Sequence, residues 1–339
     1  MDRTQLIETA QAIVADGKGI LAADESTPTI GKRFASIGAE NTEEKRAEYR
    51  GLLFTTEGMK KYISGVILYD ETIRQSSLDE GVSFPKLLSG KGVLPGIKVD
   101  TGAKPLAGHA EEKVTEGLDG LRERLEEYYE LGARFAKWRA VITIGGGIPS
   151  RACLEVNAHA LARYAALCQE AGIVPIVEPE VLMDGSHSLD TCFEETEETL
   201  SIVFHELFKQ GVMLEGMILK PNMVISALNC PEQAPVEEVA EATVECFLRV
   251  VPSAVPGICF LSGGQSELAA TQHLNAMNTG NEFLPWKLSF SYGRALQAAA
   301  LNIWGGKTEN IADAQKVFYH RAQCNSAAAL GKYNDDMEH

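Results

Sequence analysis

Two pairs of charged residues lie two positions apart within apolar segments of the sequence. Lys137 and Arg139 form the first pair, and Glu178 and Glu180 form the second. Because side chains alternate between the two faces of a strand, a spacing of two places both members of a pair on the same face. Cations there can bind a substrate anion, and carboxylates can transfer protons. We therefore predict that two strands contribute these side chains to one polar site.

A lysine amine is the candidate nucleophile. Lys220 directly follows the apolar run 217–219, and we expect burial and the nearby cation Lys137 to favour its neutral form, which can attack a carbonyl carbon. A proline follows both Lys220 and Glu178, and because proline donates no ladder hydrogen bond, we expect each charged residue to end its strand. An isolated lysine after a strand more often forms a structural ion pair. Carboxylates and further cations on the same rim favour Schiff-base chemistry, which needs all three.

Two glycine-containing segments indicate a phosphate site. Ser-Gly-Gly at 262–264 follows the apolar run 258–261, and Ser-Tyr-Gly-Arg at 291–294 ends the next run. Glycine lets backbone N–H groups approach an anion, and arginine can add two parallel hydrogen bonds. These are the seventh and eighth apolar runs of the chain, and in β/α barrels the loops after strands seven and eight frequently bind phosphate.

Eight short apolar runs must position these side chains. Helical patterns alternate with them, such as the amphipathic segment 118–131, and this alternation implies parallel strands. Eight units predict a closed (β/α)8 TIM barrel, whereas a doubly wound sheet more often has fewer strands and an early Gly-rich dinucleotide turn. Without a linker or repeat, residues 1–339 are predicted to form a single domain with an N-terminal helix and a short C-terminal tail. The predicted strands are 19–23, 65–69, 94–99, 134–143, 173–181, 217–219, 258–261 and 288–291.

Composition limits the classes of partner. The 339 residues carry a net charge of −16, which disfavours nucleic acid and anionic membranes, and no segment is apolar for long enough to span a bilayer. A small anionic substrate fits, because clustered cations in a water-poor cleft outweigh distant, screened surface charges. The N-terminus carries no secretory or transit pattern, and seven widely spaced cysteines suit reduced thiols. We therefore expect a cytoplasmic protein.

Seven blocks of the sequence closely resemble class I fructose-bisphosphate aldolase, and the resemblance covers nearly the whole chain. The resemblance implies an enzyme of glycolysis and gluconeogenesis that uses a lysine Schiff base and no metal or other cofactor. Such an enzyme reversibly cleaves the phosphosugar fructose 1,6-bisphosphate into dihydroxyacetone phosphate and glyceraldehyde 3-phosphate. The resemblance also implies a homotetramer. The matching blocks are 21–27, 96–100, 135–139, 175–180, 219–223, 261–267 and 290–295.

The resemblance further implies a role for each site residue. Lys220 would attack the C2 ketone, Glu178 would serve as acid and base in dehydrating the carbinolamine, and Asp24 would assist proton removal from the C4 hydroxyl. Lys137 would position the substrate and stabilise developing negative charge. The C1 phosphate would meet Ser262, Gly263, Gly264, Ser291 and Arg294, the distal phosphate would meet Ser26, Thr29, Arg33, Lys98 and Arg139, and Gly293 and Glu180 would complete the substrate-binding set.

Several positions depart from the family pattern. Pro28 and Thr29 stand where glycine and often serine are expected, Thr101 replaces a common lysine, and three glycines at 145–147 alter a loop. We expect these changes to affect contacts with the distal phosphate. Many family members end in a longer tail whose terminal tyrosine assists proton exchange at the enamine, whereas this sequence stops at His339. We expect slower or differently catalysed enamine protonation.

Other functions are consistent with parts of this pattern. A transaldolase-like enzyme or an aldolase for a monophosphate sugar would also use a barrel lysine, and loss of the distal cations would favour it. A metal-dependent aldolase is disfavoured because the seven histidines show no close ligand spacing, and insensitivity to EDTA would exclude it. A scaffold that binds partner proteins is disfavoured because every acid, base and amine of the reaction is present. Turnover of fructose 1,6-bisphosphate separates these functions.

Overall fold

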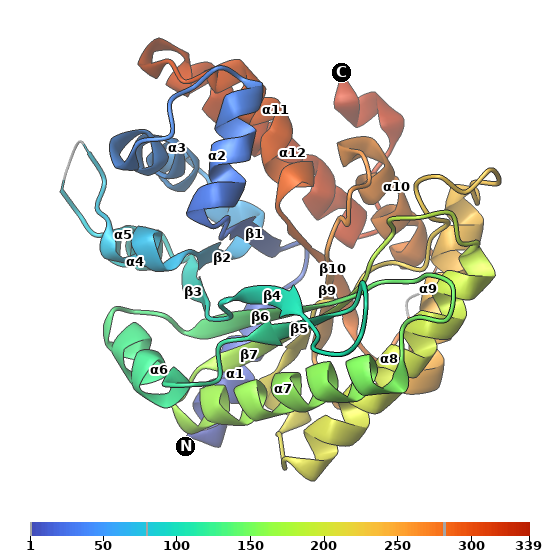
Figure 1. The fold of residues 1–339 in the computed structure, drawn as a ribbon. Coiled ribbons are helices and arrows are strands. Elements are labelled where there is room, and N and C mark those ends of the chain that lie inside the picture. Colours follow the sequence, from blue (N-terminus) through green and yellow to red (C-terminus); the bar gives the residue numbers. More distant parts are fainter. Residues whose placement is uncertain (1, 79–80, 281–282) are drawn as a thin grey trace.

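Eight parallel strands close into a barrel, which confirms the predicted (β/α)8 fold. The computed structural model describes residues 2–78, 81–280 and 283–339. Its barrel strands pair in the order β1-β2-β3-β6-β7-β8-β9-β10, and β10 pairs with β1 (Figure 1). Each of the eight predicted runs overlaps one barrel strand. The strands are β1 (Gly19–Ala23), β2 (Ile63–Leu68), β3 (Leu94–Lys98), β6 (Phe135–Ile142), β7 (Val174–Val181), β8 (Ile218–Leu219), β9 (Gly257–Phe260) and β10 (Lys287–Tyr292).

Helices surround the barrel and bury the outward side chains of its strands (Figure 1). The predicted amphipathic segment 118–131 contains α6, which buries one face and exposes the other. The helices are α1 (Arg3–Ile13), α2 (Thr27–Ser36), α3 (Glu43–Thr55), α4 (Asp70–Arg74), α5 (Phe84–Gly90), α6 (Leu121–Glu130), α7 (Arg151–Glu170), α8 (Leu189–Lys209), α9 (Val236–Val250), α10 (Glu267–Asn278), α11 (Arg294–Trp304) and α12 (Ile311–Ala329), with short 3-10 turns η1 (Met59–Lys61), η2 (Leu214–Gly216), η3 (Thr308–Asn310) and η4 (Asp335–Glu338).

Side chains inside the barrel change from apolar to charged along its axis. Near the starts of the strands, apolar side chains pack in one buried cluster with α1, which covers that end of the barrel. Three charged residues each come two positions after one of these apolar residues, namely Lys137, Glu178 and Lys220. Because alternate residues face the same side, these charged side chains enter the same lumen at the C-terminal mouth. The apolar residues that precede them are Phe135, Ile176 and Ile218.

The prediction that Glu178 ends its strand was wrong, because β7 continues through Pro179. The N–H groups of Val174 and Leu182 donate to carbonyls on the β6 side, so even-numbered residues of β7 direct their N–H groups toward β6. Pro179 therefore faces β8, which has two residues and pairs only with an earlier part of β7. Proline has no N–H group to donate, but no ladder hydrogen bond is lost at this position because β8 does not pair with it. Lys220 does follow the last residue of β8, as predicted.

A hairpin that the sequence analysis did not predict lies outside the barrel. It consists of β4 (Gly102–Pro105) and β5 (Lys113–Glu116), which pair in antiparallel orientation. Each strand has four residues, and most of them are exposed or half-buried. Such short strands with little apolar alternation carry almost no sequence signal.

The cysteines agree with the sequence analysis. All seven are free, and all except Cys230 are buried. The helices that the structure describes include none with both the length and the apolar character required to cross a bilayer.

Candidate active site

Four charged side chains form a continuous row of ion pairs at the barrel mouth. Lys137 Nζ lies 2.7 Å from Asp24 Oδ2 and 3.1 Å from Glu178 Oε2. Glu178 Oε1 in turn lies 3.1 Å from Lys220 Nζ. The residues belong to β6 and β7 or directly follow β1 and β8, so four parallel strands bring them to the same end of the barrel. The structure thus places the four predicted catalytic residues in contact.

The row is removed from solvent, and its charges stabilise one another. Lys137, Glu178 and Lys220 each expose 4% or less of their surface. Burial favours a raised carboxyl pKa, but Lys137 and Lys220 outweigh it and hold the pKa values of Asp24 and Glu178 below their ordinary range. Burial also disfavours the Lys137 ammonium, yet the two carboxylates raise the pKa of Lys137 above its ordinary range. At neutral pH, both carboxylates are ionised and Lys137 is cationic.

Replacing Lys137 by methionine should destabilise the protein most strongly at neutral pH. Removing one partner of a buried ion pair costs about 3–5 kcal/mol, and here the buried Glu178 and the half-buried Asp24 both lose a partner. Because the pKa values of Asp24 and Glu178 lie below their ordinary 3.8 and 4.5, their stabilisation is present above pH about 5 and is lost as the pH falls. The raised pKa of Lys137 adds stabilisation that is lost only as the pH rises above its ordinary 10.5.

Urea unfolding at pH 7 and pH 4 measures this effect, and the free-energy difference between variant and wild type should shrink at pH 4. Protonation then relieves the carboxylates that the variant leaves unpaired. Lys209→Met is the matched control, because Lys209 is 54% exposed and pairs with Glu206 on the outer surface. It should cost at most about 1 kcal/mol. Equal losses of stability in the two variants would contradict the stabilising role of the row.

Two further cations lie on strands next to this row, and each is held by a carboxylate. Arg139 Nε pairs with Glu180 on β7, and Lys98 Nζ lies 2.6 Å from Asp100 Oδ1. Asp100 also accepts hydrogen bonds from the backbone N–H groups of Gly102 at 3.1 Å and Arg139 at 3.2 Å. The side chain of Arg139 is 43% exposed whereas Glu180 is buried. The guanidinium therefore reaches from a fixed carboxylate toward solvent, where an anion can approach.

Three residues predicted to bind phosphate lie at α2. Ser26 precedes the helix, and its Oγ lies 3.1 Å from Thr29 Oγ1, so two hydroxyl groups meet in the first turn. Arg33 follows one turn later. Its Nη2 lies 3.8 Å from the position that a Cβ on Gly293 would occupy. Arg33, which the sequence analysis assigned to the distal phosphate, therefore also lies near the start of α11.

A buried carboxylate that the sequence analysis did not select orients Arg33. One oxygen of Glu25 pairs with Arg33 and the other lies 2.7 Å from Arg50 Nη2. Gln297 Nε2 donates to Glu25 Oε1 at 3.1 Å. Glu25 follows Asp24 in the first matching block, but no spacing relates it to Arg50 on α3 or Gln297 on α11. This network is visible only once those helices pack against β1.

The segment after β9 makes a glycine turn next to Arg294. Gly263 and Gly264 have φ values of 48° and 83°, in the left-handed region that favours glycine. A Cβ on Gly264 would lie 3.4 Å from Arg294 Nη2, so the first residue of α11 reaches this turn. Ser262 and Ser291 are buried, and Ser291 Oγ has no hydrogen-bond partner among the described residues. The turn, the hydroxyls and the helix N-terminus together offer donors to a phosphate.

A closed β/α barrel whose mouth holds a lysine amine, paired carboxylates and flanking cations is typical of enzymes that activate carbonyl substrates through a Schiff base. The family model described as fructose-bisphosphate aldolase class-I matches residues 5–339. The chain belongs to the class I fructose-bisphosphate aldolase family, as the resemblance indicated. It is a lyase of glycolysis, and reversible aldol cleavage of fructose 1,6-bisphosphate through a lysine Schiff base is the reaction of its class.

Similar proteins match along almost their full lengths. A probable fructose-bisphosphate aldolase class 1 from Xanthomonas axonopodis pv. citri (strain 306) is 63% identical over 335 residues, which cover 98% of this chain and 99% of the relative. Cytosolic fructose-bisphosphate aldolase 5 from Arabidopsis thaliana is 56% identical over 329 residues, which cover 97% and 91%. Plasmodium falciparum fructose-bisphosphate aldolase, solved in complex with TRAP and a small molecule inhibitor, matches with a TM-score of 0.96 and 51% identity over 98% of this chain and 95% of that chain. These matches favour fructose-bisphosphate cleavage over the transaldolase-like alternative.

Proposed function

We propose that Lys220 is the nucleophile in fructose 1,6-bisphosphate cleavage, with Glu178, Lys137 and Asp24 moving protons and stabilising charge around it. The row of ion pairs at the barrel mouth carries this proposal. An amine must lose a proton before it can attack a ketone, and Glu178 stands 3.1 Å from Lys220 to accept it. The amine of Lys220 and the cation of Lys137 thus each lie 3.1 Å from the carboxylate of Glu178, which is the proposed acid and base.

In the proposed reaction, Lys220 Nζ adds to the C2 ketone, and Glu178 protonates the hydroxyl of the carbinolamine, which leaves as water. Asp24 then takes the proton of the C4 hydroxyl, the C3–C4 bond breaks, and its electron pair moves onto the protonated imine as an enamine. Glyceraldehyde 3-phosphate leaves. Protonation at C3 and hydrolysis release dihydroxyacetone phosphate and restore the amine. The imine is the electron sink, so no metal or organic cofactor takes part.

Borohydride reduction in the presence of dihydroxyacetone phosphate tests the identity of the nucleophile. The imine should be trapped as a stable secondary amine, and peptide mass mapping should place it on the peptide that contains Lys220. Lys137 provides an internal comparison, because it is equally buried and also contacts Glu178. An adduct on Lys137 would overturn the assignment.

We further propose two phosphate sites beside this row at the barrel mouth. The glycine turn after β9 and the N-terminus of α11 support the first site, and the cations and hydroxyls at α2, β3 and β6 support the second. Glu180 would orient Arg139. The C1 phosphate would meet Ser262, Gly263, Gly264, Ser291, Gly293 and Arg294, and the distal phosphate would meet Ser26, Thr29, Arg33, Lys98 and Arg139.

Arg294→Ala should raise KM about tenfold or more for both fructose 1,6-bisphosphate and fructose 1-phosphate. Both substrates carry the C1 phosphate, and a hydrogen bond to a charged group contributes about 1.5–3 kcal/mol. Arg33→Ala is the matched comparison and should raise KM for the bisphosphate alone. Steady-state kinetics with the two substrates measure both effects. Equal changes for both substrates in Arg33→Ala would assign Arg33 to the C1 phosphate, next to Gly293.

We also propose that residues 1–339 act as one aldolase-type barrel domain in a cytoplasmic homotetramer. The family match over 5–339 supports the single domain, and two Arabidopsis thaliana relatives named as cytosolic support the location. The family resemblance supports the homotetramer. The net charge of −16 disfavours nucleic acid and anionic membranes as binding partners, whereas the cations at the barrel mouth support a small phosphosugar.

A further inference from the structure

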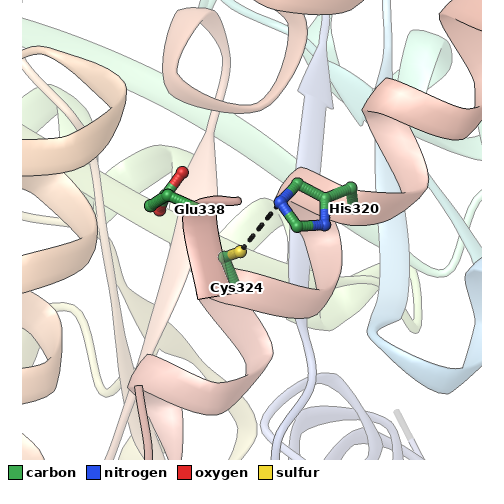
Figure 2. A group of neighbouring side chains, drawn as sticks. All are labelled: His320, Cys324 and Glu338. Carbon is green, nitrogen blue, oxygen red and sulfur yellow. Dashed lines mark hydrogen bonds between the residues drawn. The ribbon is translucent and has the colours of Figure 1, made fainter. Parts of the chain in front are cut away.

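A nitrogen, a sulfur and a carboxylate meet at the end of the chain, away from the row of ion pairs. His320 and Cys324 stand four residues apart on α12, so both side chains lie on the same helix face. His320 Nε2 lies 3.7 Å from Cys324 Sγ (Figure 2). Glu338 approaches from η4, and ligand atoms of the three residues all lie within 4.8 Å of one another. His320 and Cys324 were not considered together from the sequence, so this group was not predicted.

The segment that carries Glu338 folds back against α10 and α12. The N–H of Tyr333 donates to Asn275 on α10 at 2.9 Å, and Gln272 donates to Asp335 at 3.1 Å. Figure 1 shows the C-terminus on this side of the barrel, above α10. These contacts hold η4 over the helix face that carries His320 and Cys324. Glu338 is therefore kept near the other two side chains by the fold.

We propose that His320, Cys324 and Glu338 bind a Zn²⁺ ion that fastens η4 to α12. Zinc accepts imidazole, thiolate and carboxylate ligands together, whereas Mg²⁺ and Ca²⁺ prefer oxygen alone. Zn–N and Zn–S bonds of about 2.1 and 2.3 Å at a tetrahedral angle place the two ligand atoms about 3.6 Å apart, close to the 3.7 Å between His320 and Cys324. A small rotation of Glu338 supplies the third ligand, and water takes the fourth position.

The two anionic ligands balance the charge of the bound ion. As the Zn–S bond forms, the Cys324 thiol releases its proton to solvent, so a thiolate and a carboxylate face the divalent ion. Arg321 and Tyr333 each contact one oxygen of Glu338. Zinc would replace one of these contacts and leave the other. Cys324 is buried while His320 and Glu338 are half-buried, so the ion enters from the solvent side.

Metal titration of the full chain tests this site without relying on catalysis. After dialysis against EDTA, calorimetric titration with ZnCl₂ should give one ion per chain, and Co²⁺ should produce a thiolate charge-transfer band. His320→Gln, Cys324→Ser and Glu338→Gln should each weaken zinc binding by about tenfold or more, and Cys324→Ser should abolish the band. Cys230→Ser and His205→Gln are matched controls in other parts of the chain, and both should bind zinc as the wild type does.

Hydrogen exchange measures the proposed fastening. Zinc should slow exchange in the peptide that contains 333–338 in the wild type and leave it unchanged in Cys324→Ser. Wild-type affinity in His320→Gln or Cys324→Ser would overturn the site. Wild-type affinity in Glu338→Gln, or exchange that zinc does not slow, would overturn the link between η4 and α12. These measurements are independent of Lys220, so their failure does not bear on the proposed reaction.

Discussion

Lys220→Ala should lower kcat for fructose 1,6-bisphosphate by about 10⁴-fold or more, because the route through the imine is lost with the amine. The protein should remain folded. Glu178 loses its contact with Lys220 but keeps Lys137 at 3.1 Å, so its buried charge still has a partner. Steady-state turnover measures the first effect, and circular dichroism with urea unfolding measures the second. Borohydride with dihydroxyacetone phosphate should no longer label the variant.

Two variants separate the loss of a nucleophile from the loss of a charge. Lys220→Arg keeps the positive charge beside Glu178, but a guanidinium stays protonated and cannot attack a ketone, so this variant should be as inactive as Lys220→Ala. Lys209→Ala removes an exposed lysine from α8 and should retain full activity. Substantial cleavage by Lys220→Arg would show that the site needs only a cation at this position, and the Schiff-base assignment would then be wrong.

Glu178→Gln should lower kcat by about 10²- to 10⁴-fold, because the amide has nearly the same shape but cannot exchange a proton. Glu178 contacts both lysines of the row, so the variant loses the group that accepts a proton from Lys220 and returns it to the carbinolamine. Formation of the imine should become slow. Rapid quenching with borohydride at increasing times after mixing with dihydroxyacetone phosphate measures this rate directly.

Glu180→Gln is the matched control on the same face of the same strand. Glu180 pairs with Arg139 and has no direct ion pair with either lysine of the row among the described residues. Its loss frees Arg139 to move, so KM should rise by about tenfold while kcat stays close to wild type. If Glu178→Gln changed KM alone, or if the two variants lost kcat equally, Glu178 would be a binding residue and the proposed proton transfer would fail.

The barrel mouth could be predicted because a simple geometric rule constrains it. Phe135, Ile176 and Ile218 face the lumen, and the residue two positions after each must face it too. Parallel strands end on the same side of the barrel, so charges at their ends must meet. The rule for proline was less informative. Pro179 did not end β7. The N–H group that proline lacks would have faced β8, and the hydrogen-bond ladder between β7 and β8 ends before this position.

The sequence by itself determined the eight strands, the family and the charged residues of the mouth, since each follows from local alternation or from a matching block. The tertiary structure decided which distant side chains touch. Glu25 meets Gln297, and Cys324 lies near Glu338, only because helices outside the barrel pack in one particular way. Helical periodicity indicates which face of a helix is buried, but it does not specify the neighbour that the face will meet. Contacts between segments that no local pattern relates therefore had to be seen in three dimensions.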